Sequence, residues 1–150
     1  MTEETIYLLK EFNRLEKELD DLYHGVAVKA NISDSAFTIL YSICELGDGC
    51  LQRDICRETF ANKQTVNSSI RKLTQDGYLY LEQGRGRDKH ISLTESGRTF
   101  VEEHISPIIQ KEEAAFADLE AKEQAELLKL SKKYVNSLKL RLKEENLRDF

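Results

Sequence analysis

The stretch from Asn62 to Gln75 contains no acidic residue, and its polar side chains are types that bond nucleic acid. Val66, Ile70 and Leu73 recur at helical spacing, so we expect them to face inward. The opposite face then carries two cations, short amides and hydroxyls: Lys63, Gln64, Asn67, Ser68 and Arg71, with Thr65 and Ser69 near its flanks. Such groups can bond base edges or phosphates in a major groove, which is wide enough for a helix. An ordinary solvated helix is the alternative, although such helices usually carry more glutamate.

A second basic cluster follows at Gly84-Arg85-Gly86-Arg87-Asp88, with Lys89 and His90 directly after it. It joins two runs of strand-forming residues, 78–81 and 91–93, and glycines between such runs predict a β-hairpin. Arginines on a narrow ribbon can enter a minor groove, where negative potential attracts them. A soluble turn with stray charges is the alternative for the hairpin alone. Its position directly after a helix-turn-helix is more specific than either part.

These residues must be positioned by helices, which the hydrophobic periodicity and the capping residues predict. The expected helices cover 4–23, a segment from Ser33 or Asp34 to Gly47 with Phe37, Leu40, Ile43, Cys44 and Leu46 inward, 52–58, 62–73, 94–105, a stretch to about 119, and a last helix from about 122. Phe60 to Asn62 is the expected turn of the helix-turn-helix, and Asn62 can cap the helix that follows. Pro107 should kink or restart its helix.

The net charge of −5 over 150 residues is unusual for a nucleic-acid binder, so its distribution matters. Residues 49–98 contain nine Lys or Arg against six Asp or Glu, a local charge of +3, and the remainder must then carry −8. The basic centre is therefore compatible with phosphate binding. No apolar run approaches the roughly 18 residues of a membrane helix, and no secretory signal is visible. We expect a cytoplasmic protein with no membrane partner.

Several motifs together resemble the MarR family of bacterial regulators. They are Gln52-Arg53-Asp54-Ile55-Cys56, Lys63-Gln64-Thr65-Val66-Asn67-Ser68, Gly77-Tyr78, Gly84-Arg85-Gly86-Arg87-Asp88-Lys89 and Ile91-Ser92-Leu93-Thr94-Glu95-Ser96-Gly97-Arg98. The segment from the hairpin into the next helix is the most specific of them. The helical order outside the motifs agrees, so the resemblance covers essentially the whole chain.

The resemblance implies a mainly α fold with a small β-hairpin, in which a winged helix-turn-helix is flanked by long N- and C-terminal dimerisation helices. One domain would cover 1–150, with the winged lobe at 33–98 and dimerisation helices at 1–30 and 99–150. It also implies a homodimer that binds double-stranded DNA at a pseudo-palindromic operator. Many such proteins are repressors released by a small, often anionic aromatic effector, or by cysteine oxidation. No cofactor and no enzymatic activity are expected.

Site residues follow from the resemblance position by position. The major-groove candidates are Gln64, Thr65, Asn67 and Ser68, and the phosphate candidates are Lys63 and Arg71. Arg87 is the first choice for the wing arginine and Arg85 the second, while Asp88 should hold a nearby basic side chain. Lys89 stands where many relatives have a second arginine, and lysine lacks the planar fork of arginine. Leu51 replaces a capping threonine, so that cap is lost or shifts to a neighbour.

A family-type effector cavity would be lined by aromatic residues, for which the candidates are Phe12, Tyr23, Phe37, Tyr41 and His104, with Leu19 beside them. Core packing is the alternative interpretation for each. Cys44, Cys50 and Cys56 lack zinc-ligand spacing and are expected to be structural. A redox-responsive regulator, a metal-responsive one using His104 with Glu102 and Glu103, and a protein-interaction module without DNA binding remain alternatives. No nucleophile-and-base set or phosphate loop suggests an enzyme.

Overall fold

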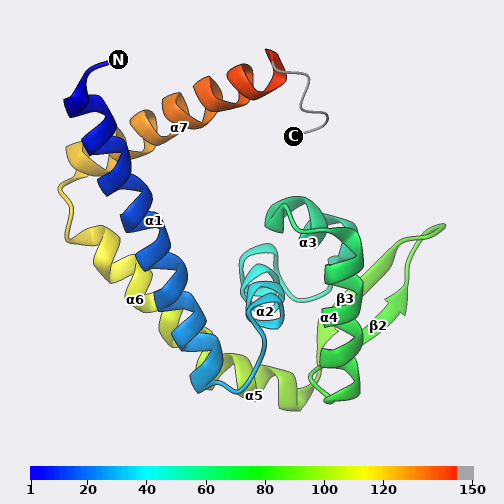
Figure 1. Ribbon diagram of the computed structural model, residues 1–150. Coiled ribbons are helices and arrows are strands. Elements are labelled where there is room, and N and C mark those ends of the chain that lie inside the picture. The colour runs from blue at the N-terminus through cyan, green and yellow to red at the C-terminus, as the bar shows by residue number, and fades with distance from the viewer. Residues whose placement is uncertain (145–150) are drawn as a thin grey trace. The chain divides into compact units, whose positions relative to one another are not determined.

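The computed structural model describes residues 1–144, which form seven helices and one three-stranded antiparallel sheet. The chain divides into two compact units, Met1–Pro107 and Ile108–Phe150. The first unit contains the helix-turn-helix and the sheet (Figure 1). The helices and strands begin and end as follows: α1 Glu3–Lys29, α2 Asp34–Leu46, β1 Cys50–Leu51, α3 Gln52–Thr59, α4 Lys63–Gln75, β2 Leu79–Gln83, β3 Lys89–Leu93, α5 Glu95–His104, α6 Ser106–Ala117 and α7 Ala121–Glu144.

Side-chain caps begin α1, α2, α4 and α5 in the first unit. The Ser33 hydroxyl accepts the Ala36 N–H at 3.1 Å, which settles the choice between Ser33 and Asp34 as the cap of α2. The Asn62 side-chain oxygen Oδ1 accepts the Gln64 N–H at 2.7 Å at the start of α4, as the sequence predicts. Leu51 gives α3 no side-chain cap, so the departure expected at this position is confirmed.

The sheet has the order β1-β3-β2, and β2 with β3 forms the predicted hairpin. We call the segment 79–93 the wing. The strand β1 was not expected from the sequence: Cys50 lies opposite Ile91 and Leu51 opposite His90. This pairing fixes the base of the wing to the start of α3. Figure 1 shows the tip of the wing projecting away from α2 and α3.

Apolar side chains from α2, α3, α4, the sheet and α5 form the core of the first unit. Its largest fully buried members are Ile39, Leu40, Ile43, Ile55, Val66, Leu73, Leu79, Ile91 and Ile105. Three expectations need correction. Leu46 is 37% exposed, because it belongs to the last turn of α2, and Cys44 is only half-buried. Ser69 is buried, so it faces the core rather than a flank of the polar face.

The junction between the wing and α5 is held by short polar contacts. The Thr94 hydroxyl accepts the Gly97 N–H at 3.0 Å and donates to the Gly77 carbonyl at 2.5 Å, while the Thr94 N–H donates to the Tyr78 carbonyl. Gly97 lies so close to this carbonyl that a Cβ there would be 2.0 Å from the Tyr78 oxygen. The glycine in the motif is therefore required for α5 to pack against the chain before β2.

The second unit consists of α7 and nearly all of α6. Gln124 of α7 donates from Nε2 to the carbonyls of Phe116 and Leu119, both at 3.0 Å, and so satisfies acceptors at the end of α6. The Glu120 N–H donates to the Glu123 carboxylate at 2.8 Å at the start of α7. Pro107 lies in the first turn of α6, so the predicted restart after α5 is confirmed. No helix within residues 1–144 is long and apolar enough to cross a membrane.

The helix boundaries differ from the expectation mainly at α1. The sequence predicts a helix over 4–23, whereas α1 continues to Lys29, with Ala27 buried near its end. The Thr2 hydroxyl accepts the Thr5 N–H at 3.1 Å and caps the start. Glu3 and Glu4 in the first turn and Lys29 in the last complement the helix dipole.

Candidate nucleic-acid interface

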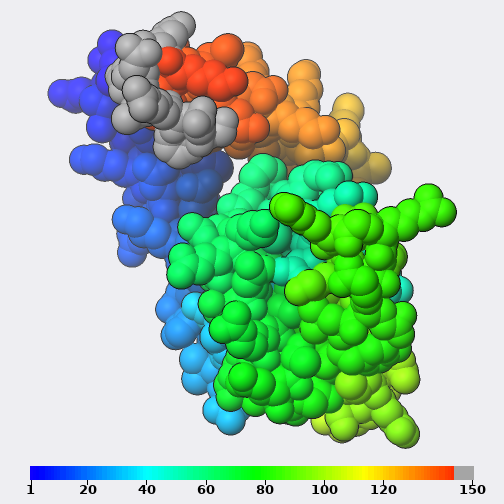
Figure 2. Space-filling view, turned by 90° about the vertical axis from the view of Figure 1, so that its right-hand side faces the viewer, coloured from blue at the N-terminus to red at the C-terminus, as the bar shows by residue number. Residues whose placement is uncertain are grey.

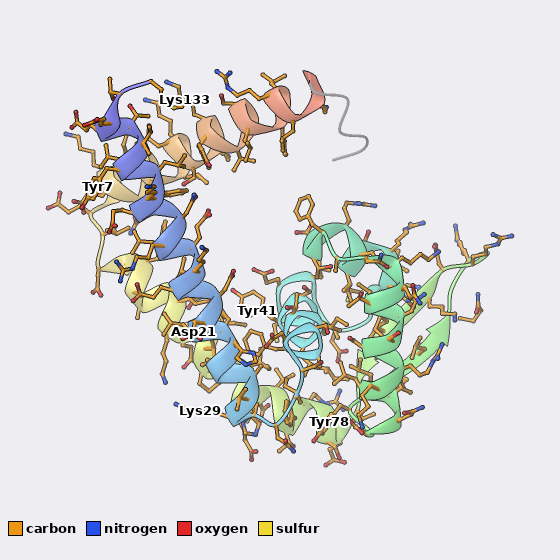
Figure 3. All side chains as sticks on the ribbon, viewed as in Figure 1. Tyr7, Asp21, Lys29, Tyr41, Tyr78 and Lys133 are labelled. Carbon is orange, nitrogen blue, oxygen red and sulfur yellow. The ribbon has the colours of Figure 1, made fainter. Side chains whose placement is uncertain are left out.

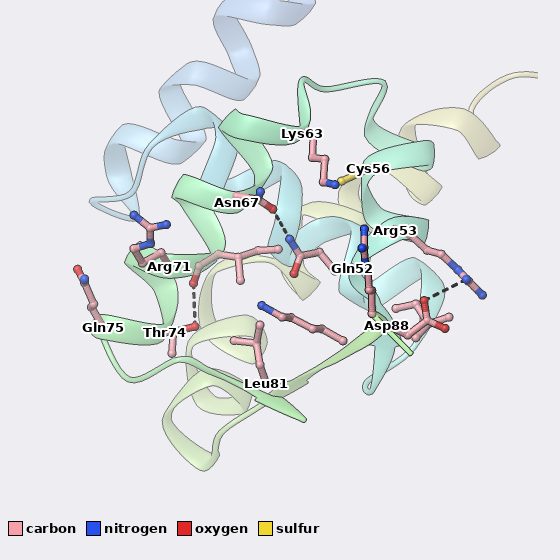
Figure 4. A pocket seen from close by; sticks show the side chains of 14 residues that line it. Gln52, Arg53, Cys56, Lys63, Asn67, Arg71, Thr74, Gln75, Leu81 and Asp88 are labelled. Atoms are coloured by element: carbon pink, nitrogen blue, oxygen red, sulfur yellow. Dashed lines mark hydrogen bonds and ion pairs between the residues drawn. The ribbon is translucent and has the colours of Figure 1, made fainter. Parts of the chain in front are cut away.

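A hollow of about 590 Å³ lies between α3, α4 and the wing (Figure 4). Figure 2 shows the residues coloured green, which include α3, α4 and the wing, as one continuous surface. The residues that line the hollow are Leu51, Gln52, Arg53, Cys56, Lys63, Asn67, Ile70, Arg71, Thr74, Gln75, Leu81, Arg87, Asp88 and Lys89. Five of these carry cationic side chains and one is acidic, so the hollow is suited to a polyanion.

The polar face of α4 splits into two parts. Lys63, Asn67 and Arg71 are four residues apart and form one stripe that lines the hollow. Thr65, with Gln64 and Ser68, is exposed but does not line it. The six predicted residues on α4 therefore present two adjoining surfaces, with both of its predicted phosphate contacts on the hollow side.

The wing adds Arg87, Asp88 and Lys89 to the hollow, whereas Arg85 is exposed at the tip and does not line it. The tip is ordered by its own hydrogen bonds: the Gly84 N–H donates to the Asp88 carbonyl at 2.8 Å, and Gln83 Nε2 donates to the Gly86 carbonyl at 2.8 Å. Gly86 has a φ of 61°, which a residue with a Cβ rarely adopts.

Asp88 holds a basic side chain, as predicted, and that side chain is Arg53 of α3. Arg53 Nη1 lies 3.0 Å from Asp88 Oδ1 (Figure 4). The carboxylate is more buried than the guanidinium, with relative exposures of 27% and 61%. The ion pair connects the helix-turn-helix to the wing, so it restrains the orientation of both.

Four residues of the hollow were not assigned a role from the sequence: Gln52, Arg53, Thr74 and Gln75. Gln52 donates from Nε2 to the Asn67 side-chain oxygen, which joins α3 to α4 inside the hollow (Figure 4). Thr74 donates to the Ile70 carbonyl at 2.8 Å and so bonds within its own helix. The spacing of α4 could have indicated Thr74 and Gln75, which lie seven and eight residues after Asn67. Gln52 and Arg53 on α3 could be recognised as part of the site only once the packing of α3 against α4 was known.

His90 supports the base of the wing rather than facing a ligand. Its Nδ1 lies 2.9 Å from the Gly49 carbonyl, which accepts the hydrogen bond. Asp48, just before, accepts the Leu93 N–H at 2.8 Å and lies 3.5 Å from Arg98. The wing is thus attached to the segment before α3 at both ends of β3.

The five aromatic candidates for an effector site lie on three helices: Phe12 and Tyr23 on α1, Phe37 and Tyr41 on α2, and His104 on α5. The ring of Phe37 contacts the rings of both Tyr23 and Tyr41, with centroid distances of 6.2 and 6.1 Å. Tyr41 lies on the side of α2 that faces α1 (Figure 3). The ring of His104 instead packs against that of Phe100, with a centroid distance of 4.5 Å, and the Phe100 ring packs against that of Tyr78, with a centroid distance of 4.6 Å. Phe12 is a further 11 residues back along α1, roughly 16 Å from Tyr23 at 1.5 Å per residue.

The cysteines and His104 bear on the redox and metal alternatives. Burial raises the pKa of the Cys44 thiol, and Glu45 raises it further. Burial also raises the pKa of Cys50, so both sulfurs stay protonated and weakly nucleophilic at neutral pH. His104 Nε2 lies 3.8 Å from Glu103, and no group of three or more His, Cys, Asp or Glu side chains gathers as a metal site within residues 1–144.

Residues 30–89 match the model of the MarR family, a stretch that includes the helix-turn-helix, β2 and the tip of the wing. This matched segment of 60 residues, out of 150, is similar to MarR proteins. MarR proteins are transcriptional regulators and form a non-enzymatic family. The mainly helical winged-helix architecture with long terminal helices is confirmed. No curated protein matches the chain.

Solved structures of MarR proteins share the fold. NMB1585, a MarR family regulator from Neisseria meningitidis, is 18% identical with a TM-score of 0.77, and the match covers 92% of this chain and 98% of that one. MepR from S. aureus, solved in complex with DNA, is 22% identical with a TM-score of 0.67 over 92% and 98%. BpsR from Bordetella bronchiseptica, whose DNA binding is regulated by 6-hydroxynicotinic acid, is 21% identical with a TM-score of 0.62 over 83% and 91%.

Proposed function

We propose that this chain is a repressor of the MarR family that binds a pseudo-palindromic operator in double-stranded DNA as a homodimer. The observation that carries the proposal is the hollow, which is lined by five cationic side chains from α3, α4 and the wing and by one carboxylate. Such a surface neutralises phosphates, and the amide and hydroxyl groups of α4 beside it are suited to base edges. The solved MepR complex with DNA adds a relative of the same fold that binds this polymer.

The two parts of the interface have different roles in the proposal. The helix α4 enters the major groove, where Gln64, Thr65, Asn67 and Ser68 face bases while Lys63 and Arg71 meet phosphates. The wing enters the adjoining minor groove and places Arg87 there, with Arg85 and Lys89 on the backbone beside it. The ion pair between Asp88 of the wing and Arg53 of α3 orients the wing relative to the helix-turn-helix.

Homodimerisation is supported by apolar surface on the first and last helices. Many large hydrophobic side chains there are exposed in the single chain: Ile6, Tyr7, Leu8, Leu9, Phe12, Leu15, Leu19, Leu22 and Tyr23 on α1, and Leu127, Leu128, Leu130, Tyr134, Val135, Leu138 and Leu140 on α7. Soluble monomers rarely leave so much apolar surface in contact with water. A two-fold dimer would present two copies of α4 to related half-sites.

Release by a small effector is the second part of the proposal. BpsR responds to 6-hydroxynicotinic acid, and a structure of the organohalide-sensing regulator RdhR holds 2,4-dichlorophenol. In this chain the rings of Tyr23, Phe37 and Tyr41 join α1 to α2 and are the favoured place for an aromatic effector. Such a ligand would lower DNA affinity only if it bound the non-operator state more tightly. A regulator must reach the genome, so we propose a cytoplasmic location.

A mobility-shift assay on the DNA upstream of the chain's own gene, across a salt series, tests the central claim. Affinity should fall steeply as salt rises, because each phosphate contact releases condensed counterions. Arg87→Ala should weaken binding on every sequence, and more than Arg85→Ala does, because Arg87 lines the hollow. Absence of binding at low salt would refute DNA recognition and favour the protein-interaction alternative.

Asn67→Ala separates base reading from phosphate binding. If Asn67 reads a base, its loss should relax preference at one position of each half-site while leaving affinity for unrelated DNA nearly unchanged. Selection from randomised operators measures this directly. An equal loss on every sequence would remove Asn67 from the base-reading set.

A further inference from the structure

We infer that Gln52 of α3 is a specificity-determining residue, because it fixes which chemical group of Asn67 faces DNA. The inference rests on the proposed function, since it presumes that α4 enters the major groove. Gln52 donates from Nε2 to Asn67 Oδ1, and both side chains are half-buried in the hollow (Figure 4). Gln52 was not among the residues that the sequence assigned to DNA.

An asparagine amide has two different ends, and the bond from Gln52 occupies one of them. The carbonyl oxygen can only accept and the amino group can only donate. With the oxygen turned toward Gln52, the end of the Asn67 amide that points away from Gln52 is the NH₂ group. In a major groove this group can donate to guanine O6 or N7, adenine N7 or thymine O4.

The surroundings favour this orientation of the amide pair over the reversed one. Lys63 and Arg71 lie one helical turn to either side of Asn67, and Arg53, Arg87 and Lys89 complete the wall of the hollow. All five are donors without an acceptor. The observed arrangement leaves the Gln52 carbonyl oxygen available to them, whereas the reversed pair would turn the Gln52 amino group toward cations.

The position of Gln52 allows its hydrogen bond to hold the Asn67 side chain in place. Gln52 is the first residue of α3, next to Leu51, whose strand pairing with His90 fixes the chain at this point. The side chain thus extends from a backbone held by the sheet and reaches a side chain on α4. The bond restrains the Asn67 side chain before it meets DNA, so less conformational entropy is lost when Asn67 binds a base.

Replacement of the Gln52 donor by an acceptor should reverse which bases Asn67 prefers. In Gln52→Glu the carboxylate is an acceptor only, so Asn67 must turn its NH₂ group toward residue 52 and leave its oxygen facing the groove. That oxygen can accept from cytosine N4 or adenine N6. In Gln52→Leu neither end of Asn67 is held, and the preference at that base pair should flatten.

The experiment uses selection from randomised double-stranded operators, followed by affinities for operator pairs that differ at one base pair. Asn67→Ala first identifies the base pair that Asn67 reads. Gln52→Glu should then change the affinity ratio at that pair by about fivefold or more toward a base that offers a donor, the effect of one hydrogen bond of about 1 kcal/mol. Gln52→Leu should bring the ratio close to one. A uniform loss from the added charge cancels in the ratio.

Thermal melting of each variant shows whether it folds, and Gln52→Ala replaces any variant that does not. The inference would be overturned if the folded Gln52 variants kept the wild-type affinity ratio between the paired operators. It would also be overturned if Asn67→Ala left the base preference unchanged. Either result leaves DNA binding intact. Failure of the wild-type chain to bind any operator would instead refute the proposed function, so the two failures are distinguishable.

Discussion

At the residue scale, the negative charge of Asp88 needs an explanation in a hollow that we propose binds phosphates. Among the described residues that line the hollow it alone is acidic, and a carboxylate there repels phosphate. Its contact with Arg53 at 3.0 Å gives the physical reason for its presence, because the pair connects the wing to α3. Arg53 is largely exposed, so the pair contributes at most about 1 kcal/mol after solvent screening. We therefore attribute its value to orientation of the wing.

Asp88→Asn tests this assignment, because charge and orientation predict opposite outcomes. The variant makes the hollow more positive, which alone would tighten DNA binding. Loss of the ion pair should free the wing, and we expect affinity for the operator to fall by about threefold to fivefold, the equivalent of up to about 1 kcal/mol. Fluorescence anisotropy at fixed salt measures the change.

Glu82→Gln is the matched control, since it removes an acid from the same hairpin at a position outside the hollow. It should leave affinity unchanged or slightly raise it. If Asp88→Asn binds as tightly as Glu82→Gln does, the bridge to Arg53 does not orient the wing.

At the element scale, the sequence predicts well what neighbouring residues decide. The caps at Ser33, Asn62 and Thr94 and the stop at Gly47 are local, since each is set by a hydrogen bond or a backbone angle within a few residues. The helices α2, α3 and α4 were accordingly expected close to their observed bounds. The extension of α1 to Lys29 was missed, because its apolar periodicity weakens after Tyr23.

Features that depend on distant residues were not predictable in the same way. The strand β1 has two residues, and its partner Ile91 is 41 residues from Cys50, so no local pattern marks it. Gln52 and Arg53 contact residues 15 and 35 positions away, and only the packing of α3 against α4 and the wing brings them together. The burial of Ser69 likewise follows from the width of the buried face of α4, which a three-residue apolar pattern underestimates.

The junction of the wing with α5 gives a prediction about an element. A Cβ at residue 97 would lie 2.0 Å from the Tyr78 carbonyl oxygen, a backbone atom that cannot rotate away. Gly97→Ala must therefore displace α5 from the segment before β2, and we expect a loss of roughly 1–3 kcal/mol in the free energy of unfolding. Urea denaturation followed by circular dichroism measures it.

Replacement of Gly25 by alanine should instead raise the free energy of unfolding. Gly25 lies inside α1, and a Cβ there would meet nothing within 4 Å. Alanine at a helical interior position is more favourable than glycine by roughly 0.5–1 kcal/mol, so Gly25→Ala should stabilise the chain. Equal effects of the two variants would show that contact with Tyr78 does not limit residue 97.

At the scale of the whole molecule, the proposed dimer predicts a dependence on concentration. Leu15 is 59% exposed on α1 in the single chain, so its loss should affect association more than folding. Leu15→Glu should raise the dimer dissociation constant at least about tenfold, because burial of a leucine contributes roughly 1.5–3 kcal/mol. Sedimentation equilibrium measures this constant, and the melting temperature should depend on protein concentration.

Asn13→Glu adds the same charge to an exposed polar position of α1, so it controls for electrostatic effects. It should leave association nearly unchanged. A wild-type chain that stays monomeric at micromolar concentration would contradict the dimer, and with it the expectation of a palindromic operator.

The geometry of a dimer makes a last prediction, about the DNA. Two copies of α4 held at a fixed separation require half-sites about one helical turn apart, roughly 34–36 Å. Insertion of five base pairs between the half-sites turns the second one to the opposite face of the duplex. Affinity should then fall to that of a single half-site, a loss on the order of a hundredfold, because the second contact is no longer intramolecular.

Insertion of ten base pairs restores the face but adds about 34 Å of distance. A pair joined by flexible linkers would recover on the second operator, whereas a pair fixed by helical packing would not. Anisotropy on the three operators therefore measures both whether the half-sites are read together and whether the spacing of the two α4 helices is rigid, which an effector would need to alter in order to release the DNA.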